Sequence, residues 1–323
     1  LGHANRVRAQ GIHIRESKSR NPQAQAAQAL TPHALFGAGN AHFHFRDCRE
    51  REKGAARILT AGQGGETIAI ILMPLPSRDF DPSETGVPWR VLSGLGHRFV
   101  FATPTGDPGV ADRLMVTGEG LGLLAPVLKA DRNGRNAYEA MITSPEFQSP
   151  LRYDAIADHS YDALLLPGGH AKGVKPYLES TLLHSTVSEF FARGKPVGAI
   201  CHGVVLAARA TTASGKSVLH GRKTTALLRS QELLAWNLTR LYLGDYYRTY
   251  PTTVEDEVTA ALAQPGDFQH GPLAIARDTP DRPNGFAVID NNYVSARWPG
   301  DCHGFSRALA GAIQVVASRR PTA

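Results

Sequence analysis

Cys201 stands where a short apolar run meets a helical pattern, in the sequence Pro196-Val-Gly-Ala-Ile-Cys-His-Gly-Val-Val-Leu-Ala-Ala. Ala199 and Gly203 flank it at two residues' distance, and small residues permit the strained strand-to-helix turn that presents a nucleophile at the edge of a sheet. The free N–H groups and partial positive charge at the start of the helix favour a thiolate. The pattern predicts a reactive cysteine, and the alternative is a small buried cysteine in a core strand.

His202 follows directly and could accept the thiol proton or, as a cation, stabilise the thiolate. The alternative is a histidine that only caps or packs at the start of the helix. A second turn, Pro-Gly-Gly-His at 167–170, closes another apolar run, and its glycine N–H groups could approach a substrate oxygen as an oxyanion hole requires. We therefore expect four residues to bind the substrate or its oxyanion: Gly168, Gly169, His170 and Gly203.

Elements that could position these turns begin near Glu66, where apolar runs alternate with helical patterns. Ser83 is the expected N-cap of a helix over 84–95, and residues 103–160 read as an insertion that shapes a pocket. The predicted fold is α/β: a flavodoxin-like, doubly wound, mostly parallel sheet in a three-layer sandwich, a single domain with insertions. The ligand site of such a sheet lies at the carboxyl ends of its strands. Strands are expected at 67–72, 98–102, 161–166, 196–200, 285–289 and 293–297.

Charge is distributed unevenly along the 323 residues. The formal charge is +6, but residues 1–65 hold ten Lys and Arg against four Asp and Glu, so residues 66–323 are neutral. This argues against a nucleic-acid partner, and we interpret 1–65 as a disordered or mis-assigned extension preceding the α/β domain at 66–323. No apolar stretch is long enough to cross a membrane.

The three cysteines, Cys48, Cys201 and Cys302, have no metal-type spacing and make no disulfide framework. They favour a reducing compartment, so we expect a cytoplasmic protein. No convincing triplet of ligands predicts a metal site.

The two motifs DALLLPGGHA (162–171) and KPVGAICHG (195–203) resemble those of the ThiJ/PfpI superfamily, whose fold is class I glutamine amidotransferase-like. The resemblance runs over roughly 68–318. Further segments are similar to the glyoxalase III and heat-shock chaperone-like branch: DPSETGVPWRVL (81–92), HGRKTTALLRSQELLAW (220–236) and YPTTVEDEV (250–258). This resemblance implies that Glu84 hydrogen-bonds the nucleophilic cysteine and that Glu232 is the acidic third member of a catalytic triad.

Glu84 has a clear physical interpretation at that position. A carboxyl beside a thiolate should have a raised pKa, since like charges disfavour double ionisation. In its protonated form it could donate a hydrogen bond to the thiolate or pass a proton during turnover. The alternative for Glu84 is a glutamate that only interacts with the dipole of a helix. The alternative for Glu232 is a solvated glutamate on the surface of a helix.

Three functions are compatible with these residues. By resemblance, Cys201 adds to the aldehyde of a 2-oxoaldehyde such as methylglyoxal, Glu84 and His202 move protons, and hydrolysis releases D-lactate without any cofactor. A cysteine hydrolase acting on peptides or amides would use the same turn and oxyanion donors. A holdase chaperone, active in stress, would instead need an exposed apolar patch. The resemblance also implies a homodimer.

Overall fold

The computed structural model describes residues 67–319, all of which lie in one compact unit, Gly64–Ala323. The interpretation of 1–65 lies outside the described residues, as does Cys48. The apolar runs form a seven-stranded sheet in the order β5-β3-β1-β6-β7-β9-β8. In chain order its strands are β1 (Ile70–Pro74), β3 (Arg98–Thr103), β5 (Leu151–Arg152), β6 (Ala163–Leu166), β7 (Val197–Ile200), β8 (Ala287–Asp290) and β9 (Tyr293–Ala296).

Every neighbouring pair in this sheet is parallel except β8 and β9, which are antiparallel. The strands β1, β6 and β7 are apolar along their whole length because both faces of the sheet are buried there. In β1, for example, Ile71 and Met73 belong to the core on one face and Leu72 belongs to the core on the other. The predicted mostly parallel sheet is confirmed.

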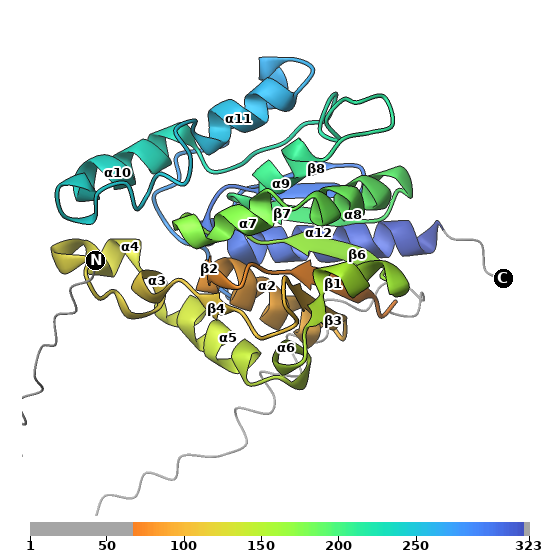
Figure 1. Ribbon diagram of the computed structural model, residues 1–323, viewed down its shortest axis with the longest axis horizontal. Coiled ribbons are helices and arrows are strands. Elements are labelled where there is room, and N and C mark those ends of the chain that lie inside the picture. Colours follow the sequence, from red (N-terminus) through yellow and green to blue (C-terminus); the bar gives the residue numbers. More distant parts are fainter. Residues whose placement is uncertain (1–66, 320–323) are drawn as a thin grey trace, which may run out of the picture. The chain divides into compact units, whose positions relative to one another are not determined.

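Helices cover both faces of the sheet, and the termini of the described chain lie away from its carboxyl edge (Figure 1). The helices α2, α5 and α12 pack together over one face, and α7, α8, α9 and α11 pack over the other. The predicted flavodoxin-like, three-layer α/β class is therefore confirmed. The bounds are α2 (Pro82–Gly94), α5 (Arg132–Ile142) and α12 (Cys302–Ser318), then α7 (Lys175–Leu178), α8 (Thr181–Ala192), α9 (Gly203–Arg209) and α11 (Val254–Ala261).

The region 103–160 is more regular than the sequence predicts. It supplies β5 and α5 to the main fold, and its strand β4 (Val110–Ala111) pairs with β2 (Arg78–Phe80) in a separate two-stranded sheet. A small core, which includes Met115, Leu121 and Tyr247, joins it to α10 (Arg229–Leu243). Its remaining elements are α3 (Arg113–Thr117), η1 (Gly122–Leu124), α4 (Ala125–Leu128), α6 (Pro145–Gln148) and η2 (Tyr153–Asp158).

Asp81, and not Ser83, is the N-cap of α2. The Asp81 side chain accepts hydrogen bonds from the backbone N–H of Ser83 at 2.7 Å and of Glu84 at 3.0 Å, and Pro82 occupies the first helical position. Aspartate before proline is a strong start signal because proline's missing N–H needs no partner there. The cap places Glu84 in the first turn of α2, which follows directly after β2.

Two further observations concern the cysteines and the membrane. Within 67–319, Cys201 and Cys302 are free thiols, and both are buried. No helix in that range has the length and apolar character needed to cross a bilayer.

Gly198, in β7, allows α12 to approach the sheet closely. A Cβ atom at this position would lie 2.7 Å from Leu309 Cδ2 and 2.9 Å from Phe305 Cζ. Gly198→Ala should lower the free energy of unfolding by about 1–3 kcal/mol through overpacking, measured by urea denaturation. The matched control is Gly94→Ala, where nothing lies within 4 Å of the added Cβ; it should be neutral or stabilising by about 0.5 kcal/mol. Equal effects in both variants would contradict this account.

Candidate active site

Cys201 occupies a strained turn between β7 and α9. Its φ is +56°, a left-handed conformation that only three non-glycine residues adopt among those described. Its backbone N–H donates to the Ala296 carbonyl at 3.1 Å, which ties the turn to β9. The predicted strand-to-turn-to-helix geometry is therefore present, at the carboxyl end of a central parallel strand.

Glu84 reaches the same point from α2 and is completely buried. Its Oε2 atom accepts a hydrogen bond from the Gly168 N–H at 3.0 Å, while its Oε1 atom is buried without a hydrogen-bond partner among the described residues. A Cβ atom added at Gly168 would lie 2.6 Å from Glu84 Oε2 and 2.9 Å from Cys201 Cβ. The absence of a side chain at Gly168 is what allows the carboxyl and the cysteine to share this space.

The pKa of Glu84 is raised well above its ordinary value, as the sequence predicts. Burial is the main cause, and the negative charge of Asp81 adds to it, whereas the hydrogen bond with the Cys201 thiol acts in the opposite direction. The predicted direction is thus confirmed, but its origin is desolvation more than repulsion by a thiolate. A carboxyl whose pKa is raised beside the thiol can hold a proton there and can exchange it with a neighbouring group.

The protonation state of Cys201 differs from the thiolate that the start of a helix favours. Burial raises the pKa of the Cys201 thiol well above its ordinary value, with the charges of Glu84 and Asp81 adding to the effect, although the His202 backbone N–H lowers it. Burial also lowers the pKa of His202 to about 3. The pair is therefore a thiol and a neutral imidazole, because the cost of burying charge exceeds the favourable effect of the helix terminus.

Thr249 determines which nitrogen of His202 carries the proton. Its hydroxyl contacts both the His170 carbonyl oxygen and His202 Nε2, the latter at 3.0 Å. A carbonyl can only accept, so the single hydroxyl proton goes to His170 and Thr249 accepts from the His202 Nε2–H. His202 Nδ1 is then unprotonated and lies 3.4 Å from Cys201 Sγ. The result is a continuous Cys–His–Thr relay that can take up the thiol proton.

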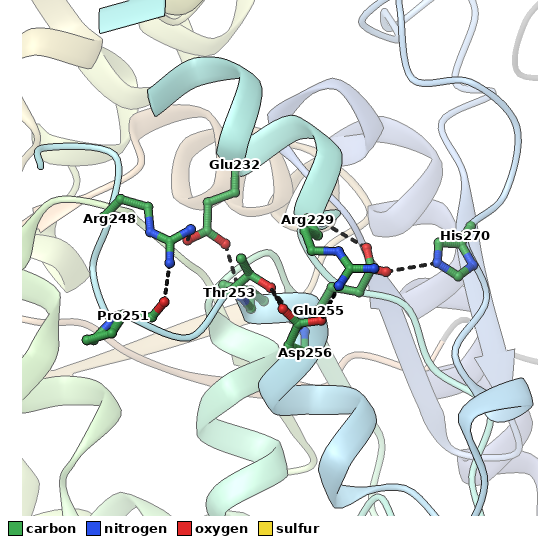
Figure 2. Close-up of polar contacts among 9 residues, drawn as sticks. Arg229, Glu232, Arg248, Pro251, Thr253, Glu255, Asp256 and His270 are labelled. Carbon is green, nitrogen blue, oxygen red and sulfur yellow. Dashed lines mark hydrogen bonds and ion pairs between the residues drawn. The ribbon is translucent and has the colours of Figure 1, made fainter. Parts of the chain in front are cut away.

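Glu232 does not contact His202. Its Oε2 atom accepts from the Val254 N–H at 3.0 Å, and its Oε1 atom lies 3.8 Å from a nitrogen of Arg248. Figure 2 shows Glu232 pointing from α10 toward the start of α11 and toward the loop that carries Arg248. The position expected of a triad acid beside His202 is occupied by Thr249, and Glu232 links two helices instead.

A wider set of polar contacts joins these helix starts (Figure 2). Arg229, at the start of α10, donates its backbone N–H to Glu255 at 2.8 Å and pairs with Asp256 at 3.0 Å. His270 contacts Glu255 at 3.0 Å. The arrangement orients α10 over the site.

The glycines expected to bind substrate have different environments. The Gly168 N–H is already engaged by Glu84, so it is not free to bind a substrate oxygen. A Cβ at Gly203 would lie 2.1 Å from the Leu166 carbonyl, and the residue allows α9 to pack on β6 without lining the cavity. Gly169 and His170 do line the cavity beside Cys201. The His170 ring stacks on Tyr247, and burial lowers its pKa to about 4.

The site opens into a cavity of about 270 Å³. Its inner end is polar and includes Asp81, Glu84 and Cys201. Apolar side chains of α10 and of the 110–130 region, among them Leu128 and Leu238, make up much of the remaining wall. Among residues 67–319 no cluster of His, Cys, Asp and Glu side chains has an arrangement that could hold a metal ion.

Three residues of this site were not identified from the sequence. Asp81 raises the pKa of Glu84 and could have been recognised from the Asp-Pro helix start. Thr249 has no sequence signal, because its contact with His202 spans 47 positions. Arg277 also lines the cavity, from a segment in which nothing distinguishes it from other surface arginines.

An α/β sheet with a buried nucleophile-elbow cysteine and a contacting carboxyl defines the class of protein. A family model described as ThiJ/PfpI family-like matches residues 75–271, more than half of the chain. The chain therefore belongs to the ThiJ/PfpI family.

Curated relatives and solved structures agree with that family. A deglycase of Thermococcus kodakarensis is 25% identical over 197 residues, which are 58% of this chain and 89% of that protein. The DJ-1 homolog D of Arabidopsis thaliana is 40% identical over 143 residues, 44% of this chain but 31% of that protein. The crystal structure of glyoxalase III from Candida albicans has a TM-score of 0.54 at 16% identity and covers 77% of this chain and 98% of that one, a likeness of fold.

Replacing Thr249 tests the relay. Thr249→Val removes the acceptor of the His202 Nε2–H at nearly constant volume, so Nδ1 loses its defined protonation state and Cys201 should react with iodoacetamide about tenfold more slowly. Thr249→Ser should restore the rate. The measurement is the labelling rate of the Cys201 peptide by mass spectrometry.

The matched control for this experiment is Thr239→Val, which removes another buried hydroxyl that bonds only to the backbone of its own helix. If Thr249→Val and Thr239→Val behave alike, or if serine does not restore the rate, the relay is wrong.

Glu232 should make stability depend on pH. Burial raises its pKa to about 7, so between the ordinary carboxyl pKa and pH 7 the folded state binds more protons than the unfolded state. Its contribution is therefore favourable at low pH and is lost as pH rises toward 7. Glu232→Gln, which keeps an acceptor for the Val254 N–H, should gain melting temperature over the wild type progressively from pH 5 to pH 8. A constant difference across that range would contradict the assignment.

Proposed function

We propose that this protein is a cysteine-dependent enzyme acting on small reactive 2-oxoaldehydes, with Cys201 as nucleophile. The observation that carries the proposal is the buried Glu84 carboxyl, whose raised pKa lets it exchange a proton beside the thiol. Acyl transfer does not need a carboxyl on the nucleophile, whereas moving a proton between adjacent carbons does need a positioned acid or base. Relatives named deglycases and the fold shared with a glyoxalase III are consistent with carbonyl chemistry.

The first step is addition of the thiol to the aldehyde. As His202 Nδ1 takes the thiol proton, Sγ bonds to the aldehyde carbon and the carbonyl oxygen receives a proton to give a hemithioacetal. The unprotonated Nδ1 faces Sγ at 3.4 Å, which suits it as the base. The thiol proton needs this acceptor because burial raises the Cys201 pKa.

The second step is an internal transfer of hydrogen. A base removes the proton from the former aldehyde carbon, an enediol forms, and reprotonation at the neighbouring carbon gives a 2-hydroxy thioester. We assign both transfers to Glu84, since a positioned carboxyl with a raised pKa can act as base and then as acid. Water then cleaves the thioester to a 2-hydroxy acid and regenerates the thiol. One carbon is oxidised and its neighbour reduced, so no external oxidant is needed.

A cysteine hydrolase is the second candidate. The Cys201–His202–Thr249 relay is the observation in its favour, because a nucleophile, a base and a group that orients the base suffice for acyl transfer. Against it, the Gly168 N–H that could stabilise an oxyanion is occupied by Glu84.

A substrate panel separates the two candidates. Purified protein should convert methylglyoxal to D-lactate, Cys201→Ala should lose at least about 10³-fold in kcat/KM, and Glu84→Gln about 10²-fold. D-lactate is measured with a stereospecific dehydrogenase. The control Cys302→Ala removes the second buried free thiol found among residues 67–319 and should retain activity. Turnover of amides but of no 2-oxoaldehyde would replace this proposal with the hydrolase.

A further inference from the structure

Unpaired polar atoms gather in the cavity above Cys201. Among the described residues, nine buried side-chain nitrogen or oxygen atoms have no hydrogen-bond partner, and six of them belong to residues that line this one cavity. Buried polar groups without a partner are uncommon and costly, so their concentration in one place indicates a ligand that satisfies them. The six atoms are Glu84 Oε1, His170 Nε2, Gln231 Oε1, Tyr247 Oη, Arg277 Nη1 and Trp298 Nε1.

Three of the six unpaired atoms are donors, those of Arg277, Trp298 and Tyr247, whereas the Gln231 amide oxygen can only accept. An arginine guanidinium and an indole N–H can only donate, and the Tyr247 hydroxyl can donate as well. Arg277 is also permanently charged and makes no ion pair with an acidic side chain in the described part of the chain. A ligand that satisfies Arg277, Trp298 and Tyr247 must therefore bring acceptor oxygens, and the charge of Arg277 favours a negatively charged one.

Arg277 is held in place by contacts that leave Nη1 unused. Its Nη2 atom donates to the Lys129 carbonyl at 3.3 Å, and its guanidinium carbon lies 5.3 Å from the centre of the Trp298 ring. The next residue, Asp278, accepts hydrogen bonds from the backbone of His303 at 3.2 Å and Gly304 at 2.7 Å, at the start of α12. These hydrogen bonds hold the segment that carries Arg277 in place, and a side chain that positions a substrate needs such support.

The positive charge of Arg277 extends to the reacting groups. Burial raises the pKa of both Asp81 and Glu84, and the charge of Arg277 opposes part of that rise, so the guanidinium lies within electrostatic range of the carboxyl beside Cys201. Arg277 and Trp298 lie beyond residues 75–271, where the family match ends. The subsite is therefore built by a part of this chain that the family model does not describe.

We propose that Arg277 and Trp298 form an anion-binding subsite that makes the enzyme selective for 2-oxoaldehydes carrying a carboxylate. This inference rests on the proposed function and specifies its substrate class. The reactive aldehyde lies at Cys201 and Glu84, the carboxylate pairs with the guanidinium and the indole N–H, and the linking carbons lie along the apolar wall that includes Leu128 and Leu238.

The test compares an anionic substrate with neutral ones. In the wild type, 4,5-dioxopentanoate should have a kcat/KM at least about tenfold above that of its methyl ester and of methylglyoxal. Arg277→Gln should abolish this preference mainly through KM, because it should raise KM at least about tenfold more for 4,5-dioxopentanoate than for the two neutral substrates. Arg277→Lys should retain part of the preference because it keeps the charge without the planar fork. The control Arg240→Gln removes an equal charge from α10 at a residue outside the cavity lining and should change nothing.

Two kinetic outcomes would overturn the inference. One is the absence of any preference for the anionic substrate in the wild type. The other is an equal loss for all substrates in Arg277→Gln together with a displaced pH profile, which would make Arg277 an electrostatic partner of Asp81 and Glu84 only.

A binding measurement separates failure of this inference from failure of the proposed function. Calorimetry of 2-hydroxyglutarate, the product expected from 4,5-dioxopentanoate, is done on Cys201→Ser and on Cys201→Ser/Arg277→Gln. Binding at least about tenfold weaker in the double variant supports the subsite even if no 2-oxoaldehyde is consumed. Equal binding, or none to either, rejects the subsite whatever the activity.

Discussion

The central constraint of this structure is that a carboxyl and a thiol are both buried at the end of a parallel sheet. Glu84 and Cys201 come from different strand ends, and only the missing side chain of Gly168 lets them meet. Desolvation disfavours the charged form of each group, so burial raises the pKa of both the Glu84 carboxyl and the Cys201 thiol and favours their protonated forms. The hydrogen bonds around Glu84, Cys201 and His202 then determine which atom carries each proton.

The surrounding contacts follow from that need. Asp81 caps α2, which holds the Glu84 backbone, and its charge raises the Glu84 pKa further. Thr249 gives His202 one tautomer and leaves Nδ1 facing the thiol. A net charge on Glu84, Cys201 or His202 is costly because the site is buried. The site therefore favours reactions in which these groups pass protons to one another or to the substrate.

Glu232 does not have the place beside His202 that the resemblance implies for a triad acid. It remains buried at the start of α10, but its carboxylate receives the first N–H of α11 and faces Arg248. In this chain it stabilises the helical layer that carries part of the cavity wall. The relay to His202 passes through Thr249, seventeen residues further along the chain. Neutral His202 needs only a hydrogen-bond acceptor at Nε2, which a hydroxyl supplies without burying another charge.

The local sequence determined the fold class and the cysteine turn, because these depend on strand hydrophobicity and on small residues beside a turn, and the resemblance to the ThiJ/PfpI superfamily implied the place of Glu84. The tertiary structure alone decided that the cysteine and histidine are neutral, that Gly168 serves the carboxyl, and that Thr249 and Arg277 belong to the site. The reason is physical: burial and long-range contacts set protonation states and hydrogen-bond partners. Thr249 contacts His202 across 47 positions of the chain, and Arg277 lines the same cavity as Cys201 from 76 positions away, so both are brought to the site only by folding.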